Sequence, residues 1–263
     1  MILNGHFIDS TMGRVFLTVT GPLPARKVVL CLPPLFEEMN LSRAVMAGQA
    51  RYFSAHGVTT CVLDYFGTGD SEGDVESVST ETWLEDVLAA GGWLKQQGVD
   101  SLMLWGVRFG GLLQLHYQRR LHEALPVSNQ LLWNPIVSGK RYVKQLMRLK
   151  QAGSLMRGDG EKADWRQHIA AGETVEVAGY PLNNRLLASI ESLEVSDQVT
   201  LGSSILWLEL GGSEVSPGTT RLVATWPGDS YQLRALPSPL FWQIPETFSV
   251  PEIYPQALSE VKF

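Results

Sequence analysis

The stretch of residues 101–111 constrains the fold of this chain more than any other. Four mostly apolar residues run into Gly106, and Gly110 opens a pattern that is typical of a helix. Glycines two residues before and two residues after Arg108 allow a strand and a helix to approach closely around a strained turn. This layout is typical of a nucleophile elbow, in which the central residue carries the reactive side chain.

The central residue of this elbow is an arginine. Serine, cysteine or aspartate would be expected at that position, whereas a guanidinium is always charged and cannot attack a carbonyl carbon. Arg108 therefore leaves open whether the chain is an enzyme at all.

Length and composition favour one large domain with an insertion. The chain has 263 residues, of which 44% are apolar, enough for a sizeable core. A net charge of −6 argues against nucleic acid or an anionic membrane surface as the main partner. No apolar run is long enough to span a bilayer and the start lacks the pattern of a signal peptide, so we expect a cytoplasmic protein. Cys31 and Cys61 lie in apolar runs and are expected to be buried, reduced thiols.

Apolar runs alternate with helical patterns along most of the chain. Short alternating runs at 6–9 and 14–20 predict a hairpin, and Ser42 is a candidate N-cap of a helix that ends near His56. Continuous apolar runs predict strands buried on both faces of a sheet at residues 27–32, 58–64, 102–105, 130–133 and 205–210. Strands that alternate with helices in this way predict an α/β fold with a mostly parallel central sheet flanked by helices.

The pattern changes after Val137. Residues 138–157 carry a run of lysines and arginines and no acidic residue, with Met and Leu recurring at helical spacing. A short strand near 174–177 and a helix from about 182 to 190 follow. We therefore predict a core made of residues 1–137 and 201–263, and an inserted helical cap made of residues 138–200.

Three strand ends read Pro33-Pro34-Leu-Phe-Glu-Glu38, Asp64-Tyr-Phe-Gly-Thr-Gly-Asp-Ser-Glu-Gly73 and Gly106-Val-Arg-Phe-Gly110. Together they resemble the α/β-hydrolase superfamily. The chain also has Glu37-Glu38 after the double proline, Trp105-Gly-x-Arg-x-Gly110, Val175-Glu-Val-Ala-Gly-Tyr180 and Phe241-Trp242. With these motifs it more closely resembles the second-type hydrolase associated with the bacterial exosortase A system. It implies the α/β-hydrolase fold with a cap, and a bacterial gene neighbourhood for exopolysaccharide synthesis and sorting of exported proteins.

The catalytic triad of that fold is incomplete in this chain. The acid follows a late strand, where Glu214 is the candidate, and the histidine follows the last strand, near residues 237–243. That segment contains no histidine, and the last histidine, His168, lies in the predicted cap. His116 lies two helical turns beyond Arg108, roughly 12 Å along the axis, too far to act as a base at the elbow.

Two roles for Arg108 remain open from the sequence. At the start of a helix, its guanidinium would hold a carboxylate, a phosphate or an acyl-thioester phosphate. Alternatively Glu37 or Glu38, which follow the neighbouring strand, would neutralise it in an ion pair. Arg43 is a further candidate for binding the ligand at the entrance to the site around Arg108.

The parts of an oxyanion hole are in place. The N–H of Phe109 and the backbone around Leu35 and Phe36 occupy the expected positions. Phe241 and Trp242 are added as binding residues on the strength of the resemblance.

Two classes of function follow. In the first, the chain is a binding protein or pseudoenzyme that holds a small anionic or acyl ligand beneath its cap. In the second, it is a hydrolase or acyl transferase in which Glu37 or Glu38 activates water or an acceptor hydroxyl. The basic cap helix would receive an acidic carrier protein. No metal-ligand spacing occurs, so we expect no metal and no other cofactor.

Overall fold

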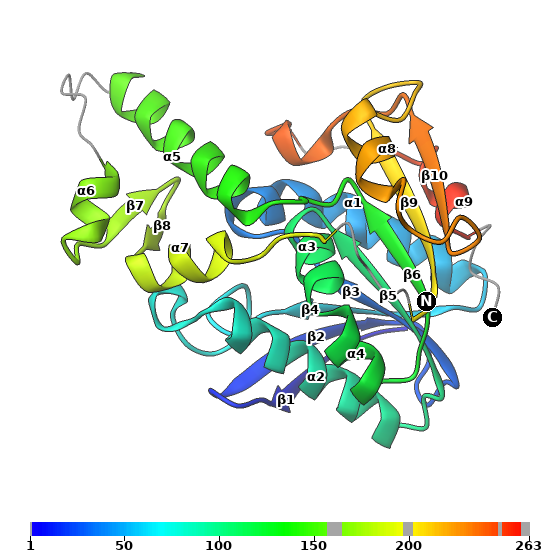
Figure 1. Cartoon of the computed structure of the whole chain (residues 1–263). Helices are drawn as coiled ribbons and strands as arrows, with labels where there is room; N and C mark the ends of the chain where they lie inside the picture. Colours follow the sequence, from blue (N-terminus) through cyan, green and yellow to red (C-terminus); the bar gives the residue numbers. More distant parts are fainter. Residues whose placement is uncertain (1, 157–164, 197–201, 247–248, 259–263) are drawn as a thin grey trace.

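The structure of the chain is a computed structural model that describes residues 2–156, 165–196, 202–246 and 249–258. Its main sheet has the strand order β1-β2-β4-β3-β5-β6-β9-β10, with helices on both faces (Figure 1). The strands are β1 Leu3–Asp9, β2 Arg14–Thr20, β3 Lys27–Leu32, β4 Thr59–Asp64, β5 Ser101–Val107, β6 Val127–Trp133, β9 Ser204–Leu210 and β10 Tyr231–Leu236.

The sheet is parallel from β4 to β10, and only the β1–β2 hairpin and its junction with β4 are antiparallel. The five strands predicted as buried are adjacent, in the order β4-β3-β5-β6-β9. Strand β3 lies beside β5, with Leu32 opposite Gly106. The residues that follow β3 therefore meet the elbow that follows β5, because the carboxyl ends of parallel strands lie at one edge.

Helices bury both faces of the sheet, which explains the continuous apolar runs. Helices α2 (Thr80–Gln96), α3 (Phe109–His116) and α4 (Gln118–Ala124) cover one face, where Leu30 and Leu32 lie in the larger apolar cluster. Helices α1 (Phe36–Ala55) and α9 (Tyr254–Leu258) cover the other, where Val29 and Cys31 lie in a second cluster. Helix α8 (Pro217–Val223) packs through Val223 on the first side. Both cysteines are free and buried, as expected.

Three helix boundaries differ from the sequence prediction. Helix α1 begins at Phe36 rather than after Ser42, because Phe36 adopts a φ of 57° that turns the chain straight from the strand end into the helix. Ser42 is buried inside this helix and its hydroxyl donates to the Glu38 carbonyl. Thr82-x-x-Glu85 fits a capping box in the sequence, but the capping box of α2 uses Ser79 and Thr82, three residues earlier. The sequence pattern also predicts one helix from about Gly110 to Glu123, but this helix is broken at Tyr117, between α3 and α4.

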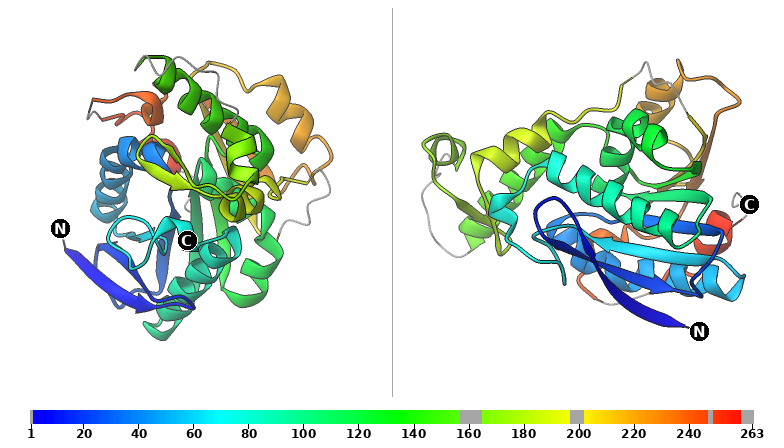
Figure 2. Two further views of the ribbon diagram at one scale, coloured as in Figure 1. Left: turned by 90° about the vertical axis from the view of Figure 1, so that its left-hand side faces the viewer. Right: turned by 90° about the horizontal axis from the view of Figure 1, so that it is seen from below.

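Residues 139–156 and 165–191 form a lobe beyond the carboxyl ends of the strands, which we call the cap lobe (Figures 1 and 2). It contains α5 (Gly139–Met156), α6 (Trp165–Ala170), β7 (Val175–Val177), β8 (Tyr180–Leu182) and α7 (Asn184–Glu191). Helix α5 packs on α7, and α7 contacts α2 of the core. Arg157 of the predicted basic run lies outside the described residues. The predicted cap boundaries at 138 and 200 stay a prediction.

A buried carboxylate joins the hairpin to the core. Asp86 of α2 accepts a hydrogen bond of 2.5 Å from the Ser10 hydroxyl and one of 2.8 Å from the Phe66 N–H. Burial raises the pKa of the Asp86 carboxyl, and the two hydrogen bonds oppose that shift. Because the folded pKa lies above the unfolded one, Asp86 contributes stability at low pH that is lost as the pH rises through the folded pKa.

Replacement of Asp86 separates its charge from its hydrogen bonds. Asp86→Asn keeps an acceptor for the Phe66 N–H and offers an NH₂ that can donate to the Ser10 hydroxyl oxygen, so it should unfold within about 1 kcal/mol of the wild type at neutral pH, with a weaker pH dependence. Asp86→Ala leaves the Phe66 N–H without its acceptor and should cost about 1–3 kcal/mol. Urea unfolding at acidic and neutral pH measures both. Equal losses for the two variants would contradict this account.

Candidate functional site

The elbow positions Arg108 between β5 and α3. Its backbone has φ 52° and ψ −111°, a conformation that costs an arginine about 1–3 kcal/mol. A methyl group at Gly106 would lie 2.6 Å from the Gly111 Cα, and one at Gly110 would overlap the Leu32 carbonyl. The turn is tied to β6, because the Arg108 N–H donates to the Trp133 carbonyl over 3.0 Å. The glycines therefore permit the close approach that the sequence pattern predicted.

The Arg108 side chain is engaged by the protein itself. Its Nη2 and Nε donate to the two carboxylate oxygens of Glu38 over 3.0 and 3.3 Å, and its Nη1 donates to the Asn134 carbonyl over 2.9 Å. The arginine side chain is 12% exposed and the glutamate side chain 13%. Of the two glutamates proposed from the sequence, Glu38 is the ion-pair partner.

An aromatic ring covers the guanidinium from the segment where a triad histidine was expected. The short helix η2 (Phe241–Gln243) places the Trp242 ring 4.5 Å from the Arg108 Cζ. This distance is that of a cation–π contact. Phe241 is buried and packs on Trp133 at 6.0 Å between ring centroids. The loop predicted to hold the histidine thus reaches the elbow and presents an indole there.

Among the described residues, the remaining charged candidates form no ion pair with the guanidinium. Glu37 is exposed and accepts a hydrogen bond from Asn40 over 3.1 Å. Arg43 forms an ion pair of 3.3 Å with Asp64. Glu214 is exposed on the loop after β9, and no contact between it and Arg108 occurs among the described residues.

The histidines do not supply a base at the elbow. His6 packs on Trp93, and His56 on Tyr52. In the second half of the chain, His116 contacts the Glu194 carbonyl, His122 contacts Ser203 and His168 contacts Glu173. The His122 Nε2 lies 2.9 Å from the Ser203 Oγ, at the start of β9 and thus at the opposite end of the sheet from Arg108.

A small pocket of about 40 Å³ lies between the start of α1 and the cap lobe. Its wall is largely apolar, with Glu37 and Glu38 at one side. The lining residues are Leu35, Phe36, Glu37, Glu38, Tyr142, Gln145, Leu146, Leu149, Val177, Ala178 and Leu182. Arg108 is not one of these lining residues, whereas its ion-pair partner Glu38 is.

Tyr142 is a pocket residue that the sequence reasoning did not single out. Its side chain is buried, and its hydroxyl has no hydrogen-bond partner among the described residues. Burial, and then the charge of Glu38, raise the pKa of Tyr142, so the phenol stays protonated. The helical spacing of apolar residues in α5 indicates that Tyr142 is buried. Its proximity to Glu38 depends on how the cap lobe packs on the core, which that spacing does not reveal.

Two backbone donors lie near the same place. Phe109 and Phe36 are the first residues of α3 and α1, so their N–H groups have no acceptor within their own helices. Both side chains are buried, and Phe36 packs on Tyr180 of the cap lobe at 5.2 Å. These donors are the ones that the sequence assigned to an oxyanion hole.

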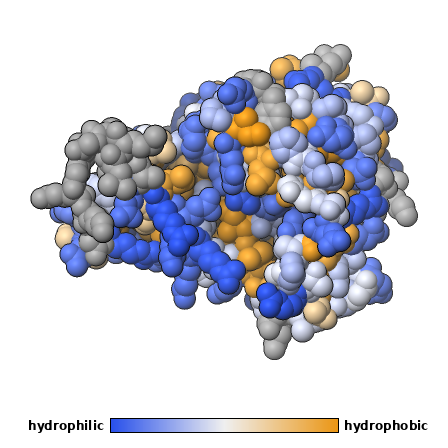
Figure 3. Space-filling model, turned by 90° about the horizontal axis from the view of Figure 1, so that it is seen from above, coloured by the Kyte–Doolittle hydropathy of each residue, from blue (hydrophilic) through white to orange (hydrophobic). Residues whose placement is uncertain are grey.

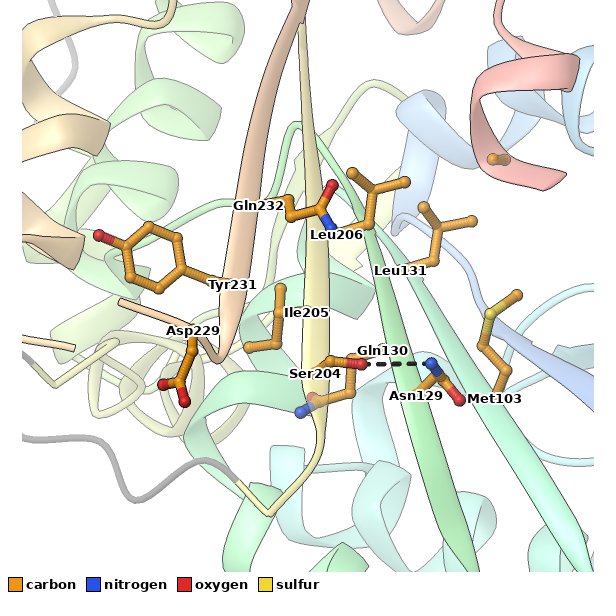
Figure 4. Close-up of a pocket in the computed structure, with 11 residues that line it drawn as sticks. Met103, Asn129, Gln130, Leu131, Ser204, Ile205, Leu206, Asp229, Tyr231 and Gln232 are labelled. Carbon is orange, nitrogen blue, oxygen red and sulfur yellow. Dashed lines mark hydrogen bonds between the residues drawn. The ribbon is translucent and has the colours of Figure 1, made fainter. Parts of the chain in front are cut away.

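A second pocket lies at the other end of the sheet (Figure 4). Its volume is about 60 Å³, and Ser204, Asp229, Tyr231 and Gln232 are among its lining residues. It includes none of the predicted site residues. The described residues contain no cluster of His, Cys, Asp and Glu that would hold a metal ion. No helix among them is long and apolar enough to cross a membrane.

The strand order, elbow and cap lobe define the α/β-hydrolase fold, and solved structures share it. A putative hydrolase from Agrobacterium vitis S4 has 17% identity and a TM-score of 0.67, covering 100% of this chain and 98% of its own. Est1E from Butyrivibrio proteoclasticus, solved with ferulic acid, has 16% identity and a TM-score of 0.62, and the match covers 97% of this chain and 100% of Est1E. The α/β hydrolase GrgF from Penicillium sp. sh18 has 17% identity and a TM-score of 0.62, and the match covers 98% of this chain and 97% of GrgF. No family model and no curated protein matches the chain.

Removal of the arginine tests what the ion pair contributes. Arg108→Ala leaves the Glu38 carboxylate largely buried without its partner and should lower the free energy of unfolding by about 3 kcal/mol. The loss should shrink as the pH falls and the stranded carboxylate takes up a proton. Urea unfolding at two pH values measures this. Arg119→Ala, which breaks an exposed pair with Glu123, is the control and should change stability by less than about 0.5 kcal/mol. A loss at Arg108 no larger than this would show that the pair is not structural.

Proposed function

We propose that this chain is a non-catalytic binding protein built on the α/β-hydrolase fold. The observation that carries the proposal is the occupation of the nucleophile position by Arg108, held by Glu38 and covered by Trp242. A guanidinium engaged in this way neither attacks a carbonyl carbon nor accepts a proton. The resemblance in sequence supports the exosortase A-associated type, with a place in the cytoplasm of a bacterium that makes exopolysaccharide.

The pocket beneath the cap lobe favours an acyl group over an anion. Arg108 already neutralises Glu38, and Glu37 adds a negative charge at the rim. Apolar side chains from the core and the cap lobe supply most of the remaining wall. A volume of about 40 Å³ admits only the end of an acyl chain, about one or two carbons long, and the Tyr142 hydroxyl and the Phe36 N–H are donors for a carbonyl oxygen beside it.

The enzymatic alternative has less support. Both carboxylate oxygens of Glu38 accept hydrogen bonds from Arg108, so Glu38 is poorly suited to take a proton from water. Glu37 is exposed and bonded to Asn40, outside the elbow.

The cap helix α5 offers a surface for a carrier of the acyl group. Lys140, Arg141, Lys144 and Arg148 are exposed on it, and α5 contains no acidic residue. The view from above shows strongly hydrophilic residues beside the cap lobe (Figure 3). The opposite face of the same helix lines the pocket through Tyr142 and Leu146. An acidic carrier protein docked on this helix would therefore hold its acyl chain near the pocket.

Absence of serine chemistry is the first test. A fluorophosphonate should label no serine, and p-nitrophenyl butyrate should hydrolyse no faster than in buffer. Arg108→Ser restores Gly-x-Ser-x-Gly and should stay unreactive, because no histidine activates the serine. Ser203→Ala is the control, since Ser203 contacts His122. Labelling of the wild type that disappears on mutation of one serine, with loss of esterase turnover, would overturn the proposal.

Binding without turnover is the second test. The same p-nitrophenyl butyrate should bind the wild type, measured by calorimetry. Gln145→Trp places a large ring at the exposed rim of the pocket and should weaken binding at least about tenfold. Gln151→Trp makes the same change on the same helix away from the pocket and should bind as the wild type does. Equal effects of the two variants would place the ligand elsewhere.

A further inference from the structure

Exposed apolar side chains concentrate on the N-terminal hairpin. Among the described residues, the exposed large hydrophobic side chains are Ile2 at 52%, Leu3 at 60%, Phe7 at 52%, Met12 at 48% and Leu149 at 54%. Four of these five lie within residues 2–12. Leu3 and Phe7 belong to β1 itself, and they lie on the same face of the strand because side chains alternate along it.

The hairpin also ends the sheet with an unpaired edge. Strand β1 is the outermost strand of the sheet, and no described strand pairs with its outer side (Figure 2). The Ile2 carbonyl accepts from Gly21 and the Ser10 N–H donates to Gly13, so the even-numbered residues of β1 face β2. The N–H and C=O groups of Leu3, Gly5 and Phe7 therefore point outwards. Strand β1 contains no lysine or proline, the usual protection of a free edge.

The sequence of this edge is self-complementary about Gly5. In an antiparallel pair of two copies centred on Gly5, Leu3 lies opposite Phe7 and Asn4 lies opposite His6. Ile2 lies opposite Ile8 in the same register. On both faces of the paired strands, apolar residues therefore lie opposite apolar residues. The polar Asn4 of each copy lies opposite the polar His6 of the other copy.

We propose that the chain forms a two-fold dimer in which β1 pairs antiparallel with β1 of a second copy, continuing the sheet through both subunits. The register centred on Gly5 pairs Leu3 with Phe7 and Gly5 with Gly5. The backbone N–H and C=O groups of these residues point outwards, so the two strands can exchange the hydrogen bonds of an antiparallel ladder. About six backbone hydrogen bonds would form across the pair. An interface of this kind is isologous, because each residue meets its counterpart by the same two-fold axis.

Side chains next to the edge fit this arrangement. The Phe16 ring of β2 lies over Gly5, where a methyl group would be 2.5 Å from the Phe16 Cζ, and it also packs on Phe7 at 5.1 Å. Leu3 and Phe7 of both subunits would extend this apolar layer across the two-fold axis. The one acidic residue of β1, Asp9, lies beyond the paired segment, so no like charges face each other.

One strand from each subunit makes a small interface. We therefore expect a reversible equilibrium in which the mass rises from 29.1 kDa toward twice that value as the concentration increases to about 200 µM. Sedimentation equilibrium of the full chain measures this directly.

A charge swap tests the register. Leu3→Lys and Phe7→Glu should each weaken the dimer at least about tenfold, because each places a charge opposite an apolar residue. The double variant L3K/F7E places lysine opposite glutamate across the axis and should restore dimerisation. Met12→Lys changes an exposed apolar residue outside the paired segment and is the control. Circular dichroism and thermal unfolding confirm that each variant is folded.

A cross-link provides a second measurement that does not depend on affinity. Asn4 and His6 form a non-hydrogen-bonded pair in this register, where side chains approach most closely. The variant N4C/H6C should form a covalent dimer under oxidation, whereas N4C alone should not, since Cys31 and Cys61 are buried. A wild type that stays monomeric, a double variant L3K/F7E that is not restored, or no cross-link in N4C/H6C would each overturn the proposal.

Discussion

The pairing of Arg108 with Glu38 is the interaction on which the rest of the site depends. The elbow presents its central side chain at the carboxyl end of the sheet, whatever that side chain is, because the glycines around it set the backbone. A permanent cation at that point requires a counter-charge when solvent is largely excluded. Glu38 supplies it from the first turn of α1, and the Asn134 carbonyl and the Trp242 ring complete the surroundings.

This arrangement changes what the fold can do. The two backbone donors near the elbow and the pocket under the cap lobe remain, so the groups that we propose to recognise a carbonyl are separate from the position at which a nucleophile would act. The indole of Trp242 comes from the segment in which the sequence reasoning expected a histidine, and it makes a cation–π contact with the guanidinium. A binding role is therefore the function that we propose for this geometry.

Much of the fold could be predicted from the sequence, and the reasons are local. Continuous apolar runs identified the strands, and the spacing of Gly106 and Gly110 identified the elbow. Each of these two patterns involves only a few neighbouring residues, so it can be recognised in the sequence. The order of β3 next to β5 then placed Glu37 and Glu38 near Arg108. Which of the two forms the pair depends on the start of α1 at Phe36, a positive-φ residue that propensity does not reveal. The contributions of Trp242, Asn134 and Tyr142 depend on long-range packing of separate segments, which no local pattern encodes.

The central claim is that Arg108 and Glu38 act as one coupled pair within a partly buried site. A double-mutant cycle of urea unfolding on Arg108→Ala, Glu38→Ala and the combined variant tests it most directly. We predict a coupling free energy of at least about 2 kcal/mol, with the combined variant more stable than the sum of the single losses implies. A coupling below about 0.5 kcal/mol would contradict the account, because the two side chains would then be independent.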